Sequence, residues 1–276
     1  NVTLYLINNI KEKTKKLLYI ILEELKNTKF KPEKTELKIK DMNFNIKLNK
    51  GVLSLTGTVD RLDSYVSCDT YYYRIIDYKT GKKTFKLSDV LLGLNMQMIV
   101  YLLAIKNFDK GYKENKPTGF LYYPALITYK KESINLSKEE VLEKLKKQMR
   151  LNGIISSSSL CFYNDNINDY IDVKTRNDIS SDKVLHDDDL NIIFNKVIEV
   201  LKDEGNKILS GDISINPIID GNNDSCLFCK FNSVCGFNKL KDKTRKYKSM
   251  SNSLTLKLIK EEGDIYGMDT GSTKSN

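Results

Sequence analysis

The sequence contains few of the residues on which several classes of protein depend. Its 276 residues include one histidine, His186, five cysteines and no tryptophan. A single histidine argues against histidine-based catalytic triads and histidine-rich metal sites. Five cysteines are too few, and odd in number, for a disulfide scaffold in a chain of this length. Because the cysteines are unevenly spaced and no N-terminal signal pattern is present, we expect a reducing, cytoplasmic environment.

Long apolar segments are missing as well. The longest runs from Val90 to Ile105, is interrupted by Asn95 and Gln97, and is shorter than the roughly 20 residues that a membrane-spanning helix needs. We therefore expect no membrane partner. The chain begins at Asn1 rather than at a methionine, which indicates a piece of a longer protein.

The composition is that of a folded, basic chain. Apolar residues make up 40% of it, which argues against intrinsic disorder. Lysine and arginine number 45 against 36 acidic residues, so the formal net charge is +9. An excess of this size favours an acidic partner such as nucleic acid, although charge alone does not say which.

Hydrophobic periodicity predicts an α/β fold with a mixed central sheet flanked by helices. Helices are expected at 3–27, 88–106, 137–150 and 187–208, and strands at 35–48, 52–66, 71–78 and 120–124. Segments 152–183 and 211–238 are expected to be irregular. We expect one domain over residues 1–248 and a polar C-terminal tail over 249–276.

Three ionisable residues fall on two consecutive predicted strands. Asp60 lies on the first, and Asp77 and Lys79, two residues apart, share one face of the second. Neighbouring carboxylates repel each other, and Mg²⁺, which prefers oxygen ligands, removes that penalty. Such an ion can acidify a water and stabilise charge on a phosphate, while a lysine orients or deprotonates that water. The pattern predicts metal-assisted phosphodiester hydrolysis, although an isolated Asp-x-Lys is usually a surface ion pair.

Flanking motifs make the pattern more specific and carry a family resemblance. The order Gly57-x-x-Asp60-Arg61, Ile75-Ile-Asp77-Tyr78-Lys79-Thr-Gly81 and Gln97-x-x-x-Tyr101 resembles the RecB-type branch of the PD-(D/E)xK nucleases, and within it the AddB family. The resemblance covers roughly residues 30 to 240. It implies a restriction-endonuclease-like core and an exonuclease that hydrolyses single-stranded DNA within an ATP-dependent helicase–nuclease complex for double-strand break repair.

The resemblance also implies roles for individual residues. Asp60 and Asp77 would ligate Mg²⁺ with the backbone carbonyl of Tyr78, and Lys79 would position or activate the attacking water. Gln97 and Tyr101 would face the DNA backbone. Glu36 is a weaker site candidate, and Arg61 pairs either with a carboxylate or phosphate or within a structural ion pair. The family often has a histidine or glutamate in the preceding helix, where this chain offers Glu12, Glu23 and Glu24 and none can be assigned.

Three of the five cysteines form a second motif, Cys226-x-x-Cys229 followed by Cys235. Two thiolates on one tight turn suit a shared metal, either Zn²⁺ or an iron–sulfur cluster, and both need a fourth ligand. Unliganded cysteines in a loop are the alternative. In the family that the chain resembles, these three join a distant upstream cysteine to hold a [4Fe–4S] cluster. Neither Cys68 nor Cys161 matches that position, so we expect the cluster in the full-length protein and an absent or incomplete one here.

Two interpretations of function therefore remain. The first is a Mg²⁺-dependent nuclease that acts on single-stranded DNA beside an AddA-type helicase–nuclease subunit. The second is a non-catalytic DNA-binding or scaffold fragment with a structural cysteine segment, and the intact Asp60, Asp77 and Lys79 favour the enzyme. Lysine runs at 82–86, 144–147 and 239–248 are typical of solvated faces, but beside a nuclease site they can also follow phosphates.

Overall fold

The chain folds into two compact units. The computed structural model describes residues 2–81, 83–127, 137–164, 167–173, 182–220, 223–227, 229–246 and 248–268. The first unit comprises Asn1–Phe44, Ser54–Phe85 and Gln97–Asn195, and the second comprises Asn45–Leu53, Lys86–Met96 and Lys196–Asn276.

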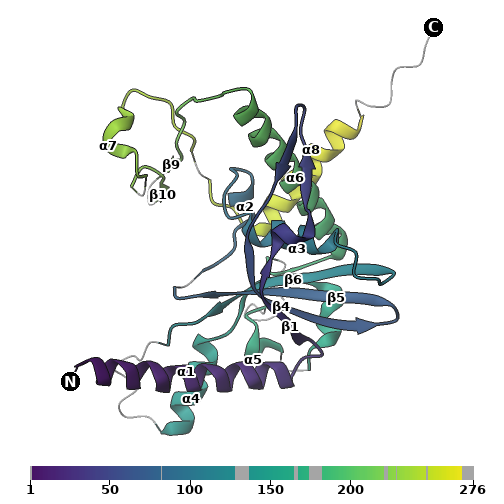
Figure 1. Cartoon of the computed structure of the whole chain (residues 1–276), viewed down its shortest axis with the longest axis vertical. Coiled ribbons are helices and arrows are strands. Elements are labelled where there is room, and N and C mark those ends of the chain that lie inside the picture. Colours follow the sequence, from purple (N-terminus) through teal and green to yellow (C-terminus); the bar gives the residue numbers. More distant parts are fainter. Residues whose placement is uncertain are drawn as a thin grey trace. The chain divides into compact units, whose positions relative to one another are not determined.

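The first unit is built on a mixed six-stranded sheet, so the predicted α/β architecture is confirmed (Figure 1). Its strands are β1 (Lys31–Lys38), β4 (Thr58–Ser67), β5 (Thr70–Lys79), β6 (Glu114–Pro124), β7 (Asn152–Ser156) and β8 (Val184–Leu185), in the order β1-β4-β5-β6-β7-β8. β5 and β6 run parallel, as do β7 and β8, and the other neighbours are antiparallel. β4 and β5 are consecutive and centrally placed, as the spacing of the acidic residues requires.

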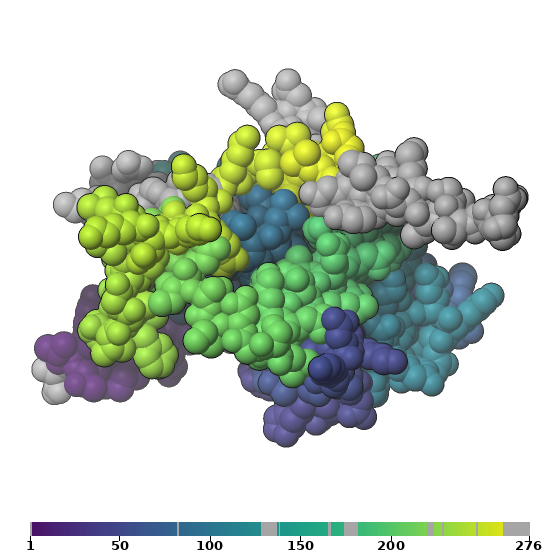
Figure 2. Space-filling view, turned by 90° about the horizontal axis from the view of Figure 1, so that it is seen from above, coloured from purple at the N-terminus to yellow at the C-terminus, as the bar shows by residue number. Residues whose placement is uncertain are grey.

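Helices cover both faces of this sheet. α1 (Val2–Lys26) lies along one face together with α4 (Lys138–Gln148) and α5 (Ile167–Tyr170), and α3 (Gln97–Lys106) lies on the other (Figure 1). The α1 face is closed by one apolar cluster: Ile20, Ile76, Leu121, Tyr123, Ile127, Leu145, Met149, Leu151, Ile155, Ile171 and Val173. The first turns of α1, purple in Figure 2, carry apolar side chains that remain exposed, among them Ile7 and Ile10.

Local sequence signals explain several of these elements. Ser137 caps α4 in a capping box, because its hydroxyl accepts from the Glu140 N–H while the Glu140 carboxylate accepts from the Ser137 N–H. The single helix predicted over 88–106 is instead two, α2 (Leu87–Val90) and α3. Gly93 and Asn95 between them have left-handed φ values of +75° and +52°, which a right-handed helix cannot contain.

The segment 152–183, expected to be irregular, contributes to the sheet. It contains β7, the 3₁₀ helix η3 (Ser157–Phe162) and α5, and it leads into β8. Its serine and asparagine residues concealed a short strand whose pairing with β6 holds it in place. Residues 165–166 and 174–181 of that segment lie outside the described residues.

The second unit is largely helical. It contains the hairpin of β2 (Asn45–Lys47) and β3 (Val52–Ser54), α2, the later turns of α6 (Asp187–Leu209), the short pair β9 (Ile219–Asp220) and β10 (Asn223–Asp224), α7 (Asn232–Cys235) and α8 (Asn252–Met268). α8 falls within 249–276, expected as a polar tail, and its Leu256 and Ile259 are buried. Residues 269–276 lie outside the described residues.

Among the helices in the described part of the chain, none is both long enough and apolar enough to cross a bilayer.

We predict that Gly119→Ala weakens the pairing of β6 with β7. Gly119 has φ +139°, and a Cβ there would lie 2.2 Å from the carbonyl oxygen of Ile154. We expect the free energy of unfolding, measured in urea, to fall by at least about 2 kcal/mol. Gly111→Ala is the control, since Gly111 has φ +76° but nothing within 4 Å of its Cβ position. Equal losses in the two variants would contradict the steric explanation.

Candidate active site

The two candidate carboxylates come together where β4 and β5 part. The antiparallel register places Arg61 opposite Ile76, and Asp60 and Asp77 are the next residues along the two strands. Asp60 Oδ2 accepts a hydrogen bond of 2.9 Å from the backbone N–H of Tyr78. The Asp60 side chain thus binds the backbone that links Asp77 to Lys79, where the ladder between the two strands ends.

Asp77 and Lys79 form an ion pair at this point. Lys79 Nζ lies 2.5 Å from Asp77 Oδ2, with the lysine side chain 34% exposed and the aspartate side chain 8% exposed. Asp77 Oδ2 has no geometrically ideal hydrogen bond, so the lysine charge is what compensates its burial. The lysine therefore reaches solvent from the carboxylate, which is the position that a group acting on a bound phosphate or water must have.

α3 covers the face of the sheet that carries these residues. Tyr73 donates its hydroxyl to the carbonyl of Leu102 in α3, and Asp77 lies on the same face as Tyr73 by strand alternation. Gln97 and Tyr101, one turn apart on α3, are joined by a 2.9 Å hydrogen bond from Gln97 Nε2 to Tyr101 Oη.

Gly57 brings α3 close to the start of β4. A Cβ at Gly57 would lie 2.4 Å from Tyr101 Oη, so the Tyr101 ring rests directly against the glycine backbone. Gly57 is three residues before Asp60, and its carbonyl accepts from the Ile39 N–H. The spacing Gly-x-x-Asp thus has a steric reason: it leaves room for the aromatic ring of the helix motif beside the carboxylate strand.

The opposite face of the same two strands carries a buried network of charges. Asp63 receives hydrogen bonds from Arg61 Nη2 and Arg74 Nε, at 2.9 and 3.0 Å, and Arg74 Nη2 lies 2.8 Å from Glu24 Oε1. All four side chains are buried. Burial by itself lowers the pKa of Arg74, but the charges of Glu24 and Asp63 raise it well above its ordinary value. Two cations and two anions therefore compensate one another within the core.

This network answers two questions that the sequence left open. Arg61 is part of an ion pair, and it also donates from Nη1 to Tyr78 Oη at 2.8 Å. Glu24, unlike the exposed Glu12, lies in the network and therefore on the face away from Asp60 and Asp77. The signal that could have revealed the network is Arg74 itself, a charged residue inside the apolar run of β5.

Glu36 is exposed and has a left-handed φ of +50°. Its neighbours Thr35 and Leu37 pair with Arg61 and Val59, so its backbone lies across from Asp60 on β1. The described residues contain no group of three or more acidic, cysteine or histidine side chains able to hold a metal. Two carboxylates nevertheless fit Mg²⁺, which is commonly bound by one or two carboxylates and keeps several waters.

The cysteine motif lies in the second unit. The Cys226 N–H donates to Asp224 Oδ1 at 2.9 Å, and the Cys229 N–H donates to the Cys226 carbonyl at 3.3 Å. Cys235 ends α7. All five cysteines are free thiols, and Phe228 within the motif lies outside the described residues.

Comparison with known proteins agrees with this geometry. A model of the PD-(D/E)XK nuclease superfamily matches residues 3–236. The chain belongs to this superfamily. The match includes both strands of the carboxylate pair, α3 and the cysteine motif, so the family resemblance seen in the sequence is confirmed.

The relatives within the superfamily share one description. The AddB subunit of the ATP-dependent helicase/deoxyribonuclease of Clostridium tetani is 32% identical over 84% of this chain. The proteins of the same description from Clostridium acetobutylicum and Clostridioides difficile are each 28% identical, over 96% and 95% of the chain. The chain spans only 22%, 25% and 24% of the lengths of these three relatives.

We predict that Arg74→Met strongly destabilises the first unit, because it leaves Glu24 with no close cation and Asp63 with one cation fewer. Breaking a buried pair in this way costs about 3–5 kcal/mol, and urea unfolding would measure it. Lys15→Met removes the same charge from an exposed pair with Glu12 and should leave the unfolding midpoint unchanged. If both variants unfolded at the wild-type midpoint, the network would have no structural role.

Proposed function

We propose that the chain is a Mg²⁺-dependent deoxyribonuclease module that hydrolyses single-stranded DNA within a longer helicase–nuclease. The observation that carries the proposal is the meeting of Asp60, the Tyr78 backbone, Asp77 and Lys79 at one end of the β4–β5 pair. Membership of a nuclease superfamily supports phosphodiester hydrolysis, and the description of the relatives supports DNA as the substrate.

Each site residue has a distinct task in this proposal. Asp60 and Asp77, with the carbonyl of Tyr78, would hold Mg²⁺, which when bound offsets phosphate charge and makes a water more acidic. Lys79 would orient the attacking water or neutralise charge on the phosphate from its half-exposed position beside Asp77. Gln97 and Tyr101 would face the DNA backbone from α3, where their mutual hydrogen bond fixes the Gln97 amide.

The setting of this module is also a proposal. The names of the relatives support an ATP-dependent complex with an AddA-type subunit, exonucleolytic action and a role in DNA repair. In the full-length protein, Cys226, Cys229 and Cys235 would hold a [4Fe–4S] cluster with a fourth cysteine from elsewhere. A cytoplasmic location remains a prediction from the sequence.

We predict that Asp77→Asn abolishes cleavage. Loss of one of two carboxylates should lower the rate by at least about 100-fold, because the remaining oxygens cannot hold the cation at the phosphate. Internally labelled single-stranded DNA is incubated with the chain, alone and within the longer protein, with Mg²⁺ or with EDTA. A partner subunit present in the assay carries an inactivated nuclease.

Asp69→Asn is the matched control for this experiment. It makes the same charge change in the turn of the same β4–β5 hairpin, and asparagine tolerates the φ of +59° found there. Cleavage that was equal in the wild type and in Asp77→Asn would reject the enzyme and favour the non-catalytic DNA-binding alternative.

We predict that Lys79→Ala lowers turnover more than it lowers metal affinity. The lysine contacts Asp77 but supplies no oxygen ligand, so kcat at saturating Mg²⁺ should fall about 100-fold. The Mg²⁺ concentration that gives half-maximal activity should change far less. A proportionate loss of Mg²⁺ affinity would show that Lys79 supports the metal site instead of the reaction.

A further inference from the structure

A basic cavity of about 250 Å³ adjoins the candidate active site in the first unit. Its lining includes four basic side chains, Lys79, Lys83, Lys147 and Arg150, and one acidic side chain, Asp172. Lys79 is therefore shared between this cavity and the carboxylate pair. The volume is far larger than the roughly 10–15 Å³ that a single water needs, so the cavity can admit a larger group.

The charge of the cavity is not balanced by its own acidic residue. Asp172 Oδ2 already binds Lys183 Nζ at 2.5 Å, and its Oδ1 lies 3.8 Å from Arg150 Nη2. Lys147 is exposed and forms no ion pair with any residue that the structure describes. Like charges gathered in one hollow produce a positive potential that attracts anions.

The fold assembles this cavity from two of the lysine runs that the sequence displays. Lys83 belongs to the run 82–86, which follows β5, and Lys147 belongs to the run 144–147 on α4. Lys82 lies outside the described residues. The two runs are about 60 residues apart in the chain, so their convergence beside Lys79 is a property of the tertiary structure.

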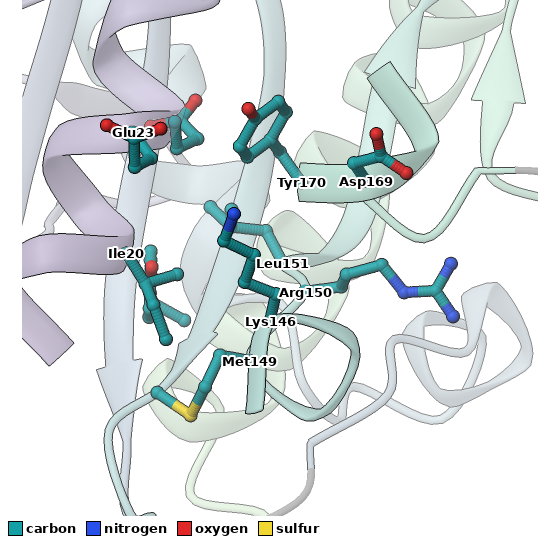
Figure 3. Close-up of a pocket in the computed structure, with 10 residues that line it drawn as sticks. Ile20, Glu23, Lys146, Met149, Arg150, Leu151, Asp169 and Tyr170 are labelled. Atoms are coloured by element: carbon teal, nitrogen blue, oxygen red, sulfur yellow. The ribbon is translucent and has the colours of Figure 1, made fainter. Parts of the chain in front are cut away.

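Neighbouring lysines of α4 face different surroundings. Successive helix residues are about 100° apart around the axis. Lys146 lines a separate small pocket with Ile20, Glu23 and Met149, where Figure 3 shows its ammonium pointing toward Glu23 and Tyr170. Lys147 instead lines the basic cavity. The same helix thus directs one lysine away from the cavity and the next one into it.

We propose that this cavity binds a phosphate of the substrate strand next to the phosphodiester held at Lys79, and that Lys147 makes the principal contact. A polymer engaged at Lys79 must continue beyond it, and a basic cavity lined by the same lysine offers its backbone the nearest compensation of charge. The proposal rests on the proposed function, since it names how the substrate of that site is held.

The test compares Lys147→Gln with Lys146→Gln, which make the same charge change at adjacent positions. Binding of the full chain to fluorescein-labelled oligothymidylate is followed by fluorescence anisotropy without divalent metal, over a range of NaCl concentrations. Arg150 is left intact because it also donates to the Asn168 carbonyl at 3.1 Å, so its substitution would disturb the fold.

Lys147→Gln should weaken binding about 3- to 10-fold and reduce the slope of log K against log [NaCl] by about 0.7, the value for one phosphate contact with a single strand. Lys146→Gln should leave the slope unchanged. In cleavage assays Lys147→Gln should raise KM with little change in kcat. Equal slopes for the two variants would overturn the proposal.

The binding assay needs no cleavage, so failure of this proposal is distinguishable from failure of the proposed function. If Asp77→Asn cleaves as well as the wild type but the two lysine variants differ in slope, the cavity binds DNA in a non-catalytic module. If cleavage depends on Asp77 and the slopes are equal, the nuclease stands and the strand follows another path.

Discussion

The antiparallel pairing of β4 with β5 is the constraint on which the rest of the first unit depends. Each strand carries charged residues on both faces, and only one register sends each set to its proper side. Asp60 and Asp77 then lie on the α3 face, while Arg61 and Asp63 lie on the α1 face. A slip of one residue would exchange the faces and bury unpaired carboxylates in the apolar core.

Tyr78 connects the two faces of this pair. Its backbone N–H binds Asp60, while its side-chain hydroxyl accepts from Arg61 within the buried network. Buried ion networks contribute little net stability, but they penalise every arrangement that leaves one member unpaired. The network is therefore suited to hold the Asp77–Lys79 segment in one position, so that rigidity at the candidate site originates on the opposite side of the sheet.

Much of the fold follows from local signals, and the exceptions have identifiable causes. The long helices α1 and α6 and the capped start of α4 are recognisable from periodicity and from Ser137 with Glu140. β7 and β8 are short and polar, and they are strands because β6 and β7 pair with them. The break before α3 depends on two left-handed residues, Gly93 and Asn95, whose conformations a helical hydrophobic pattern conceals.

The sequence by itself determined which residues have the chemistry for hydrolysis, because carboxylate and lysine at strand spacing must share a face. It also determined the family, since Gly57, Asp60, Asp77, Lys79 and the α3 motif occur in a characteristic order. Only the tertiary structure decided that Glu24 belongs to the buried network and that two remote lysine runs line one cavity. Those arrangements depend on contacts between elements far apart in the chain, which no local periodicity encodes.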